Sequence, residues 1–258
     1  MIMTMIRLRL YAISLLLTTS LRRLEKMLVR CSWHIVPNEV ENKLGAQLHL
    51  AIAATGAARA AAILMRKRMG RESEVCQRAF LESSLLMMFF AWGMETKPLQ
   101  RWINEWDKPL SGFPFREWVG AEIPKRLDWI SSVPFPANEI FRVLSNISVH
   151  PTRSSSQRAW DEAARRSGFK YPNQEIRNLE VGLEPIVSIC KMALFLLELN
   201  IFLQFLRKDL LSQPEIPVQF RQIHKTMTEG VTEDALKEIG GHLKLVYKLF
   251  PGGYTWGP

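Results

Sequence analysis

Apolar residues recur at every third or fourth position along most of this chain, and runs of strictly alternating apolar and polar residues are absent. The three-to-four period is typical of amphipathic α-helices, whereas alternation would indicate strands. We therefore predict an all-α fold, an up-and-down helical bundle with a Pro/Trp-rich middle insertion. Long helices are predicted over residues 4–33, 39–67, 72–92 and 174–211, and shorter ones over 138–150, 215–228 and 232–249.

Glycine, asparagine and proline set the predicted helix ends. Gly70 and Gly93 are expected to cap the C-termini of the second and third helices, because glycine readily adopts the backbone conformation that ends a helix. Asn138 is expected to cap the N-terminus of a helix that ends near His150. Pro151 sets that end, since proline disfavours helical geometry in the residue before it.

Residues 95–137 are broken by prolines and carry four tryptophans. This pattern predicts short helices folded over the main bundle, either as a packed connector or as a functional lid. The 258 residues are expected to form a single domain. Its predicted parts are basic N-terminal helices (1–94), the Pro/Trp-rich connector (95–137), C-terminal helices (138–250) and a tail (251–258).

The formal net charge of +9 is concentrated near the N-terminus. Residues 1–70 contain eleven Lys or Arg and three Glu, whereas residues 71–258 contain 23 Lys or Arg and 22 Asp or Glu. Such asymmetry favours a nucleic acid or another acidic partner; the alternative is a set of solvated helix faces. The candidate nucleic-acid-binding residues are Arg22, Arg23, Lys26, Arg66, Lys67 and Arg68.

Three widely separated cysteines, Cys31, Cys76 and Cys190, include no Cys-x-x-Cys pair. This argues against a disulfide framework and against a zinc knuckle, and each cysteine is expected to be a small core residue. The chain also lacks a P-loop, a Gly-rich dinucleotide fingerprint, an H-E-x-x-H helix and a G-x-S-x-G elbow. We predict no cofactor, no metal and a cytoplasmic location.

Two apolar stretches bear on membrane binding. Residues 10–17 follow a basic start, but this run is shorter than the roughly 20 residues that span a bilayer. Residues 186–206 contain Lys191 and Glu198, which favours a buried core helix. A membrane surface is therefore not the expected partner; the alternative is a peripheral protein that contacts lipid through the helix at 4–33.

Arg78 and Glu82 are opposite charges four residues apart in one of the most apolar stretches of the chain. On a helix they share one face, and a buried charge without a partner would be costly. One interpretation is a buried salt bridge between the two that fixes the helix register. The other is that one of them serves a pocket, where burial could raise the pKa of Glu82.

A second polar group lies downstream, where Arg142, Asn146 and His150 recur every four residues, with Ser145 beside them. On a helix these residues form a polar stripe, and Phe141 belongs to the opposite, apolar face. An arginine can hold a phosphate while a histidine moves a proton during RNA cleavage. The alternative is a histidine that caps the helix and donates a hydrogen bond to a neighbouring helix.

The segments 56–60, 74–82 and 144–151 together resemble a group of bacterial helical proteins. In that group an R-x-x-x-E helix, here Arg78 to Glu82, is followed by a helix of the S-x-x-x-H or S-x-x-V-H-P type, here Leu144-Ser145-Asn146-Ile147-Ser148-Val149-His150-Pro151. These proteins are similar to the HEPN superfamily (higher eukaryotes and prokaryotes nucleotide-binding). The resemblance covers roughly residues 45–210.

The resemblance implies an all-α up-and-down bundle that is often dimeric. Active members cleave RNA without metal, through an R-x(4–6)-H motif from each protomer across a dimer cleft, and many act in toxin–antitoxin or anti-phage systems. Carried onto this chain, the histidine is His150 and the arginine is Arg142, with seven residues between them and Val143 after the arginine. Arg78, Glu82 and Ser145 match the pattern of the subgroup.

We carry three functions forward. The first is a HEPN-like RNA-acting protein, a metal-independent ribonuclease effector whose partners are RNA and a second copy or another protein. Its candidate catalytic residues are His150, Arg142, Arg78 and Glu82, with Ser145 and Asn146 supporting the polar pocket. The second is a non-catalytic helical module that binds nucleic acid, a nucleotide or a protein, and the third is the peripheral membrane protein.

Overall fold

The all-α prediction is confirmed by a computed structural model of the chain. The structure describes residues 2–34, 43–67, 69–93, 97–104, 115–127, 135–145, 174–220, 237 and 241, and these contain helices and no strand. The predicted elements at 146–173 and 221–258, including the tail, lie largely outside the described residues.

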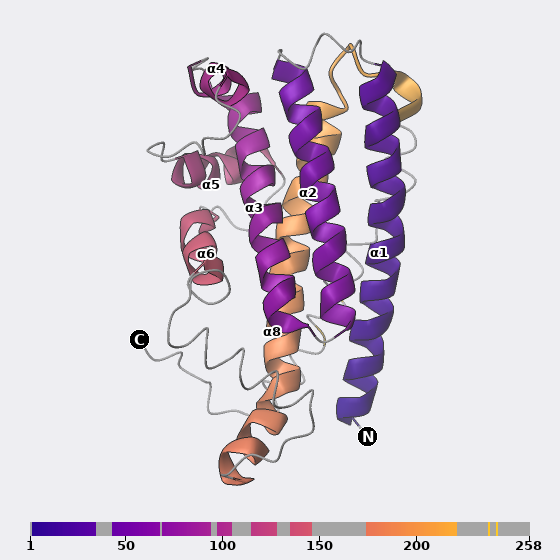
Figure 1. The fold of residues 1–258 in the computed structure, drawn as a ribbon, viewed down its shortest axis with the longest axis vertical. Helices are drawn as coiled ribbons and strands as arrows, with labels where there is room; N and C mark the ends of the chain where they lie inside the picture. Colours follow the sequence, from indigo (N-terminus) through magenta and orange to yellow (C-terminus); the bar gives the residue numbers. More distant parts are fainter. Residues whose placement is uncertain are drawn as a thin grey trace.

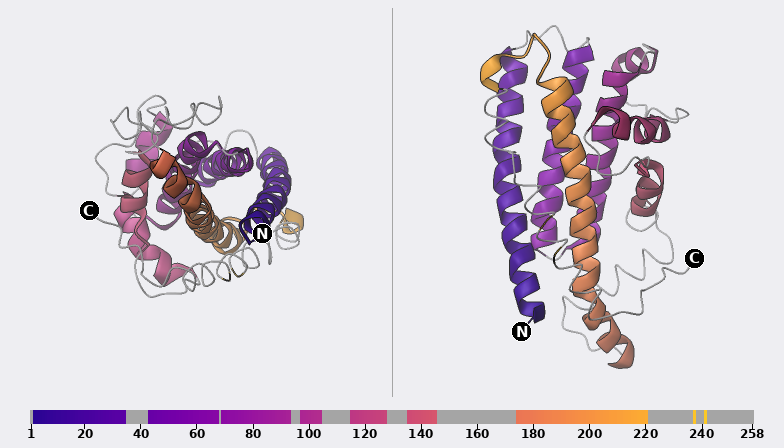
Figure 2. Two further views of the ribbon diagram at one scale, coloured as in Figure 1. Left: turned by 90° about the horizontal axis from the view of Figure 1, so that it is seen from below. Right: turned by 180° about the vertical axis from the view of Figure 1, so that it is seen from behind.

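Four long helices form the bundle: α1 (Ile2–His34), α2 (Lys43–Arg66), α3 (Gly70–Trp92) and α8 (Gln174–Phe205). The first three alternate in direction, and α8 lies behind α2 and runs parallel to α3 (Figures 1 and 2). The shorter α4 (Lys97–Asn104), α5 (Phe115–Arg126) and α6 (Ala137–Leu144) lie on one side of α3 (Figure 1). A π-helical turn, η3 (Leu206–Leu210), ends α8.

Small residues allow α2 to pack closely against its neighbours. Ala54, Ala58 and Ala61 are fully buried, and side chains of this size let two helix backbones approach. Two hydroxyl groups donate hydrogen bonds to the backbone of α2 across these close contacts. Ser14 of α1 donates to the Ala62 carbonyl oxygen at 2.6 Å, and Ser73 of α3 donates to the Ala61 carbonyl oxygen at 3.2 Å. These hydrogen bonds tie α1 and α3 to the last turns of α2.

Aromatic contacts join α3 to α8 along their parallel seam. The Phe80 ring meets Phe195 and Phe202 edge-on, with centroids 6.0 and 5.4 Å apart. Farther along, Trp92 meets Phe205 in the same manner at 5.4 Å. Edge-to-face pairs add stability beyond their buried area, so this seam is a main part of the core.

A buried carboxyl group lies in the same seam. Gln77 Nε2 of α3 donates to Glu198 Oε2 of α8 at 3.0 Å, and within the described part of the chain Glu198 Oε1 has no hydrogen-bond partner. Burial raises the pKa of Glu198 to about 8, against the weaker lowering by the Gln77 hydrogen bond. Burial therefore favours the protonated form of Glu198 near neutral pH. A neighbouring ion pair, Lys191 with Glu74, adds a second polar link between the two helices.

The connector packs against α3. Phe115, Val119 and Ile123 of α5 are buried, and the Phe135 amide donates to the Gly120 carbonyl oxygen at 2.9 Å. A Cβ on Gly120 would collide with the Phe135 carbonyl oxygen, so glycine is needed for this close approach of two backbones.

Two predicted helix caps are wrong. Gly70 is the first residue of α3 rather than the cap of α2. Asn138 is the second residue of α6, whose N-cap is Pro136, and its side chain instead donates to Glu117 of α5 at 2.9 Å. The third prediction is confirmed, since the Gly93 amide caps α3 by donating to the Phe89 carbonyl oxygen at 2.8 Å.

Among the described residues, two segments are long and apolar enough to cross a membrane by length and composition: Lys43–Arg66 and Ser188–Leu210. Each segment contains an apolar stretch of 18 residues, and the bundle buries 44% of this stretch in the first segment and 61% in the second. Core helices of soluble proteins meet the same two criteria, so these helices alone do not identify a membrane protein.

The buried Glu198 predicts a distinctive pH dependence of stability. Because its folded-state pKa is raised from 4.5 to about 8, the folded protein keeps a proton that the unfolded chain releases. The stabilisation is full below about pH 4.5 and is lost as the pH rises towards 8. In Glu198→Gln the amide oxygen still accepts from Gln77, but the side chain cannot lose a proton. The Tm of this variant should therefore match that of the wild type near pH 5 and exceed it by about 5 °C at pH 8.

The control is Glu215→Gln, which changes an exposed glutamate in the same way. Scanning calorimetry across this pH range measures all three proteins. Parallel curves for the wild type and Glu198→Gln would show that the buried carboxyl does not hold its proton.

Candidate functional site

Glu82 pairs with a residue that the sequence pattern did not single out. Arg116 of α5 donates from Nη2 to Glu82 Oε1 at 2.8 Å, with side-chain exposures of 23% and 39%. The predicted Arg78–Glu82 salt bridge is therefore wrong, because the ion-pair partner of Glu82 among the described residues is Arg116. The pair connects α3 to α5 instead of linking two turns of one helix.

Phe141 of α6 brings Arg78 into the same cluster. The Arg116 guanidinium carbon lies 3.6 Å from the centroid of the Phe141 ring, and that of Arg78 lies 4.7 Å from it. The negative face of an aromatic ring attracts cations, and Glu82 neutralises one of the two charges. Two guanidinium groups from different helices thus share one ring, and their charges with that of Glu82 sum to +1.

Three buried polar atoms on α3, α5 and the end of α6 lack hydrogen-bond partners within the described part of the chain: Arg78 Nε, Arg116 Nε and Ser145 Oγ. Ser145 is 6% exposed and follows Phe141 by one helical turn. Buried donors without partners cost free energy, and they gain an acceptor when an anion binds. We call Arg78, Glu82, Arg116, Phe141 and Ser145 the arginine cluster; it is the candidate functional site.

Local structure explains how these residues meet. Arg116 lies in the first turn of α5, and Gly120, one turn later, admits the Phe135 backbone that leads into α6. The hydrogen bond from Asn138 to Glu117 holds the start of α6 beside α5. Phe141 then lies one turn into α6, against α3.

The remaining predicted catalytic residues are not part of the described cluster. Arg142 is exposed, although its neighbour Phe141 is half-buried, so the predicted role of Arg142 in the polar pocket is not supported by its placement. Asn146 and His150 lie outside the described residues. Of the predicted set, the structure brings Arg78 and Glu82 together through Arg116 and Phe141, and it buries Ser145 one helical turn after Phe141.

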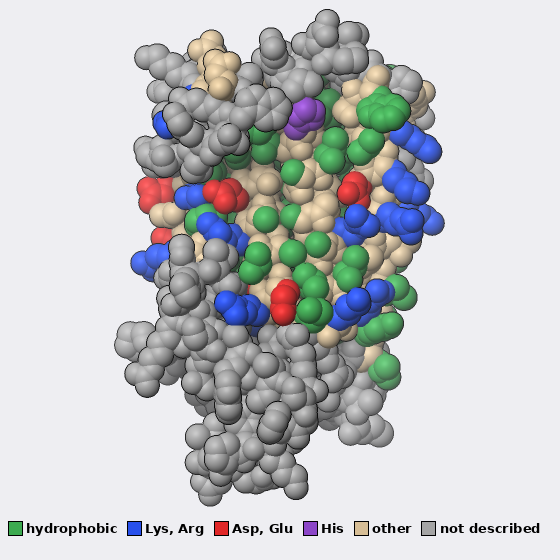
Figure 3. Space-filling view, viewed as in Figure 1, with side chains coloured by type: hydrophobic (Ala, Val, Ile, Leu, Met, Phe, Trp, Pro, Cys, Tyr) green, Lys and Arg blue, Asp and Glu red, His purple; other side chains and the backbone are tan. Residues whose placement is uncertain are grey.

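The predicted nucleic-acid-binding residues separate into two groups. Arg22, Arg23 and Lys26 are exposed on α1, and Arg30 is exposed farther along the same face; we call these four residues the cationic ridge. None of them forms an ion pair with a described residue. Figure 3 shows Lys and Arg side chains along the α1 edge of the molecule, and a second group on the opposite edge, over the connector helices.

The second group of predicted residues lies at the C-terminal end of α2. Arg66 is half-buried there, and its guanidinium lies 5.7 Å from the Tyr11 ring centroid. Lys67 is exposed, and Arg68 lies outside the described residues. Arg59 of α2 forms an ion pair with Glu25 of α1 at 3.0 Å, which links the two helices.

Cysteine and metal chemistry receive no support from the described residues. Burial raises the pKa of Cys31 to about 11 and also raises those of Cys76 and Cys190, so the reactive thiolate is disfavoured at all three. No group of three His, Cys, Asp or Glu side chains among the described residues could hold a metal ion.

Sequence reasoning missed Arg116 and Phe141 as members of the site. Arg116 lies 34 residues from Glu82, in a segment interpreted as a connector, and Phe141 was assigned to an apolar face without a polar partner. A charged residue between Phe115 and Trp118 is a weak signal for cation–π contacts, and this local pattern does not predict which ring the charge will contact.

No protein-family model, curated protein or solved structure matches this chain. The HEPN-like resemblance therefore stays a prediction. The arginine cluster and the cationic ridge are the features of the structure that bear on function.

The arginine cluster predicts a preference for phosphate over chloride. Inorganic phosphate should raise the Tm of the wild-type protein above its value in chloride at equal ionic strength. Arg78→Gln removes a guanidinium without touching the Arg116–Glu82 pair, and it should weaken phosphate binding by about 10-fold.

Arg142→Gln is the matched control, because Arg142 is an exposed arginine next to Phe141. Thermal shifts measured over a phosphate titration give the affinities. Equal losses in the two variants, or no effect of phosphate on the wild type, would contradict an anion site here.

Proposed function

We propose that this protein binds RNA, with the arginine cluster holding a phosphate group and the cationic ridge holding the backbone of the strand. The observation that carries the proposal is the set of buried donors without partners among the described residues: Arg78 Nε, Arg116 Nε and Ser145 Oγ. Arginine suits this role because its planar group donates several hydrogen bonds to phosphate oxygens.

The cationic ridge supports the proposal through its geometry. From Arg22 to Arg30 it covers nine residues, which span about 12 Å of helix, and all four side chains project within one sector of α1. Contacts of this kind to phosphates bind nucleic acid without regard to sequence and release counterions. Helix α1, which bears the ridge, and α5 and α6, which contribute to the cluster, lie on opposite sides of the bundle (Figure 1), so one strand would have to cross the molecule to reach both.

Cleavage is the second part of the proposal. His150 would act as general acid and base, as the HEPN-like resemblance implies, while Arg78 of the cluster stabilises the charge that develops on the phosphate. No metal takes part in this reaction scheme. An effector role in a toxin or anti-phage system, a second copy or protein partner, and a cytoplasmic location belong to the same proposal.

Cleavage assays test the catalytic part. Wild-type protein should cut RNA in the presence of EDTA, and His150→Ala should lose at least about 100-fold in rate while it binds phosphate as before. If the wild type and the variant leave the same RNA fragments, the catalytic role of His150 is wrong. Binding without any cleavage would instead favour the non-catalytic module.

Salt dependence tests the ridge. RNA affinity should fall steeply between low and high salt. Replacing the four ridge residues with glutamine should reduce the slope of log affinity against log salt concentration by about three to four. The control is a variant in which Lys125 and Arg126, exposed on α5, become glutamine. A slope that the ridge variant leaves unchanged would place the RNA elsewhere.

A second candidate function rests on exposed apolar side chains of α1. Leu8, Tyr11, Leu15 and Leu16 are 64%, 52%, 45% and 53% exposed on the same side of the helix as the ridge. Soluble proteins seldom expose such groups together, and apolar residues beside cations are typical of helices that lie on anionic membranes.

Liposome co-sedimentation distinguishes this candidate. Lipid binding predicts that the full chain pellets with vesicles containing phosphatidylserine, and that changing Leu8, Leu15 and Leu16 to glutamine abolishes this while RNA binding persists. A wild-type protein that stays in the supernatant would exclude the membrane candidate.

A further inference from the structure

A cavity of about 390 Å³ opens at the end of the bundle where α2 begins and α8 ends. Its polar lining comes from the start of α2 (Lys43 and Gln47), from η3 (Asp209) and from the segment after η3 (Gln213 and Glu215). The volume lies at the small end of the range for ligand pockets. The cavity shares no residue with the arginine cluster or the cationic ridge.

Gln47 lines this cavity with its side-chain amide. It is 1% exposed, and its Oε1 accepts a hydrogen bond from Gln213 Nε2 at 2.9 Å. The side chain of Gln47 lines the cavity, so its amino group can donate a hydrogen bond to a ligand there.

Asp209 presents an acceptor to the same cavity. It lies in the π-helical turn η3, and such turns are rare and are often found at functional sites. Its Oδ1 accepts from Trp92 Nε1 at 3.1 Å, and its other oxygen has no hydrogen bond with a described residue. Burial raises the pKa of Asp209, and the Trp92 hydrogen bond and the Arg126 and Lys208 charges oppose this.

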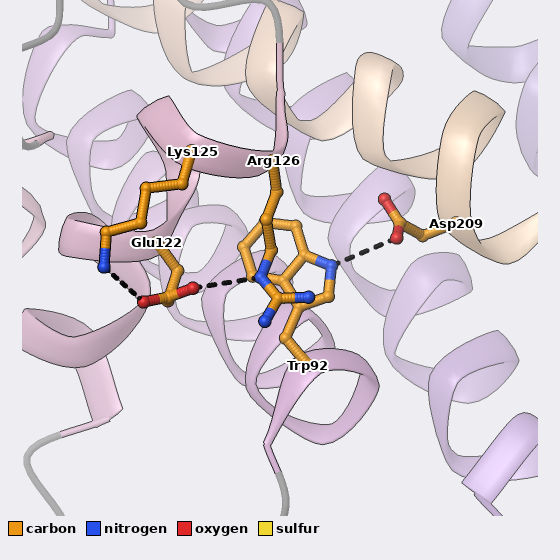
Figure 4. A network of polar contacts seen from close by, with 5 residues as sticks. All are labelled: Trp92, Glu122, Lys125, Arg126 and Asp209. Atoms are coloured by element: carbon orange, nitrogen blue, oxygen red, sulfur yellow. Dashed lines mark hydrogen bonds and ion pairs between the residues drawn. The ribbon is translucent and has the colours of Figure 1, made fainter.

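A polar network holds Asp209 in place. Figure 4 shows Trp92 between Asp209 and Arg126, whose guanidinium lies 5.5 Å from the Trp92 ring centroid. Glu122 accepts from Arg126 at 3.0 Å and from Lys125 at 2.8 Å. These two bonds lower the pKa of Glu122, so the carboxylate stays charged and fixes Arg126 over the tryptophan.

The charges of the cavity come from different elements. Lys43 and the positive end of the α2 dipole form what we call the α2 wall, and Asp209 in η3 and Glu215 after it form the η3 wall. The charged side chains of the lining sum to −1, which disfavours a phosphate dianion. An anionic group would be held at the α2 wall, where the Gln47 amino group can donate to it, and a cationic group at the η3 wall.

We propose that this cavity binds a small zwitterion of the amino-acid class, with its carboxylate at Lys43 and Gln47 and its ammonium group at Asp209 and Glu215. This site goes beyond the proposed RNA binding and does not depend on it.

Thermal-shift titrations with the twenty standard L-amino acids test the proposal on the full-length protein. At least one of them should raise the Tm in a saturable manner, and its N-acetyl and C-amide derivatives, which each lack one charge, should not. Lys43→Ala and Asp209→Asn should each weaken binding by about 10-fold or more. The introduced asparagine side chain would still accept from Trp92, and Lys43 is exposed, so both variants are expected to fold.

The matched control is Lys67→Ala, which removes an exposed lysine just beyond the other end of α2 and should leave the affinity unchanged. The proposal is overturned if none of the twenty amino acids shifts the Tm, or if the singly charged derivatives bind equally well. It is also overturned if a nucleoside monophosphate shifts the Tm and the amino acids do not.

Discussion

The parallel seam between α3 and α8 is the constraint on which the other features depend. Gln77 and Phe80 of α3 meet Glu198 and the two phenylalanines of α8, so polar and aromatic contacts fix the register of the two helices together. A buried polar pair adds little net stability, but a shifted register would leave both of its members unsatisfied. The seam therefore favours one alignment over its neighbours.

Helix α3 contacts a different part of the molecule on each of its sides. Gln77 and Phe80 project towards α8, while Arg78 and Glu82 project towards the connector helices and form the arginine cluster. The C-terminal end of α3 supplies Trp92, which holds Asp209 beside the cavity. Because one rigid helix positions all three groups, a change in the seam would move the cluster and the cavity together.

The sequence allowed the helices to be predicted but not the partners of their side chains. The apolar period identified α1, α2, α3 and α8 to within a few residues, since that period reflects which face is buried. Periodicity carries no information on which distant helix covers a given face. The helical spacing of Arg78 and Glu82 therefore suggested a local pair, whereas the structure supplies Arg116 from a helix 34 residues away.

The two wrong caps have a related physical cause. Gly70 was assigned by glycine's preference for helix ends, and Asn138 by the preference of its amide for N-caps. In the structure the chain turns directly into α3 at Gly70, and the Asn138 amide bonds to Glu117 instead. Local preferences identified the positions where helices meet, and tertiary contacts decided which helix each residue joined.

Photo-cross-linking with a 4-thiouridine-labelled RNA, followed by mass spectrometry of the cross-linked peptides, tests the central claim most directly. The account predicts cross-links in the segment of α1 that bears Arg22 to Arg30 and in the segments of α3 and α5 that bear Arg78 and Arg116. Cross-links confined to other surfaces, or none above the level of an unlabelled control, would contradict it.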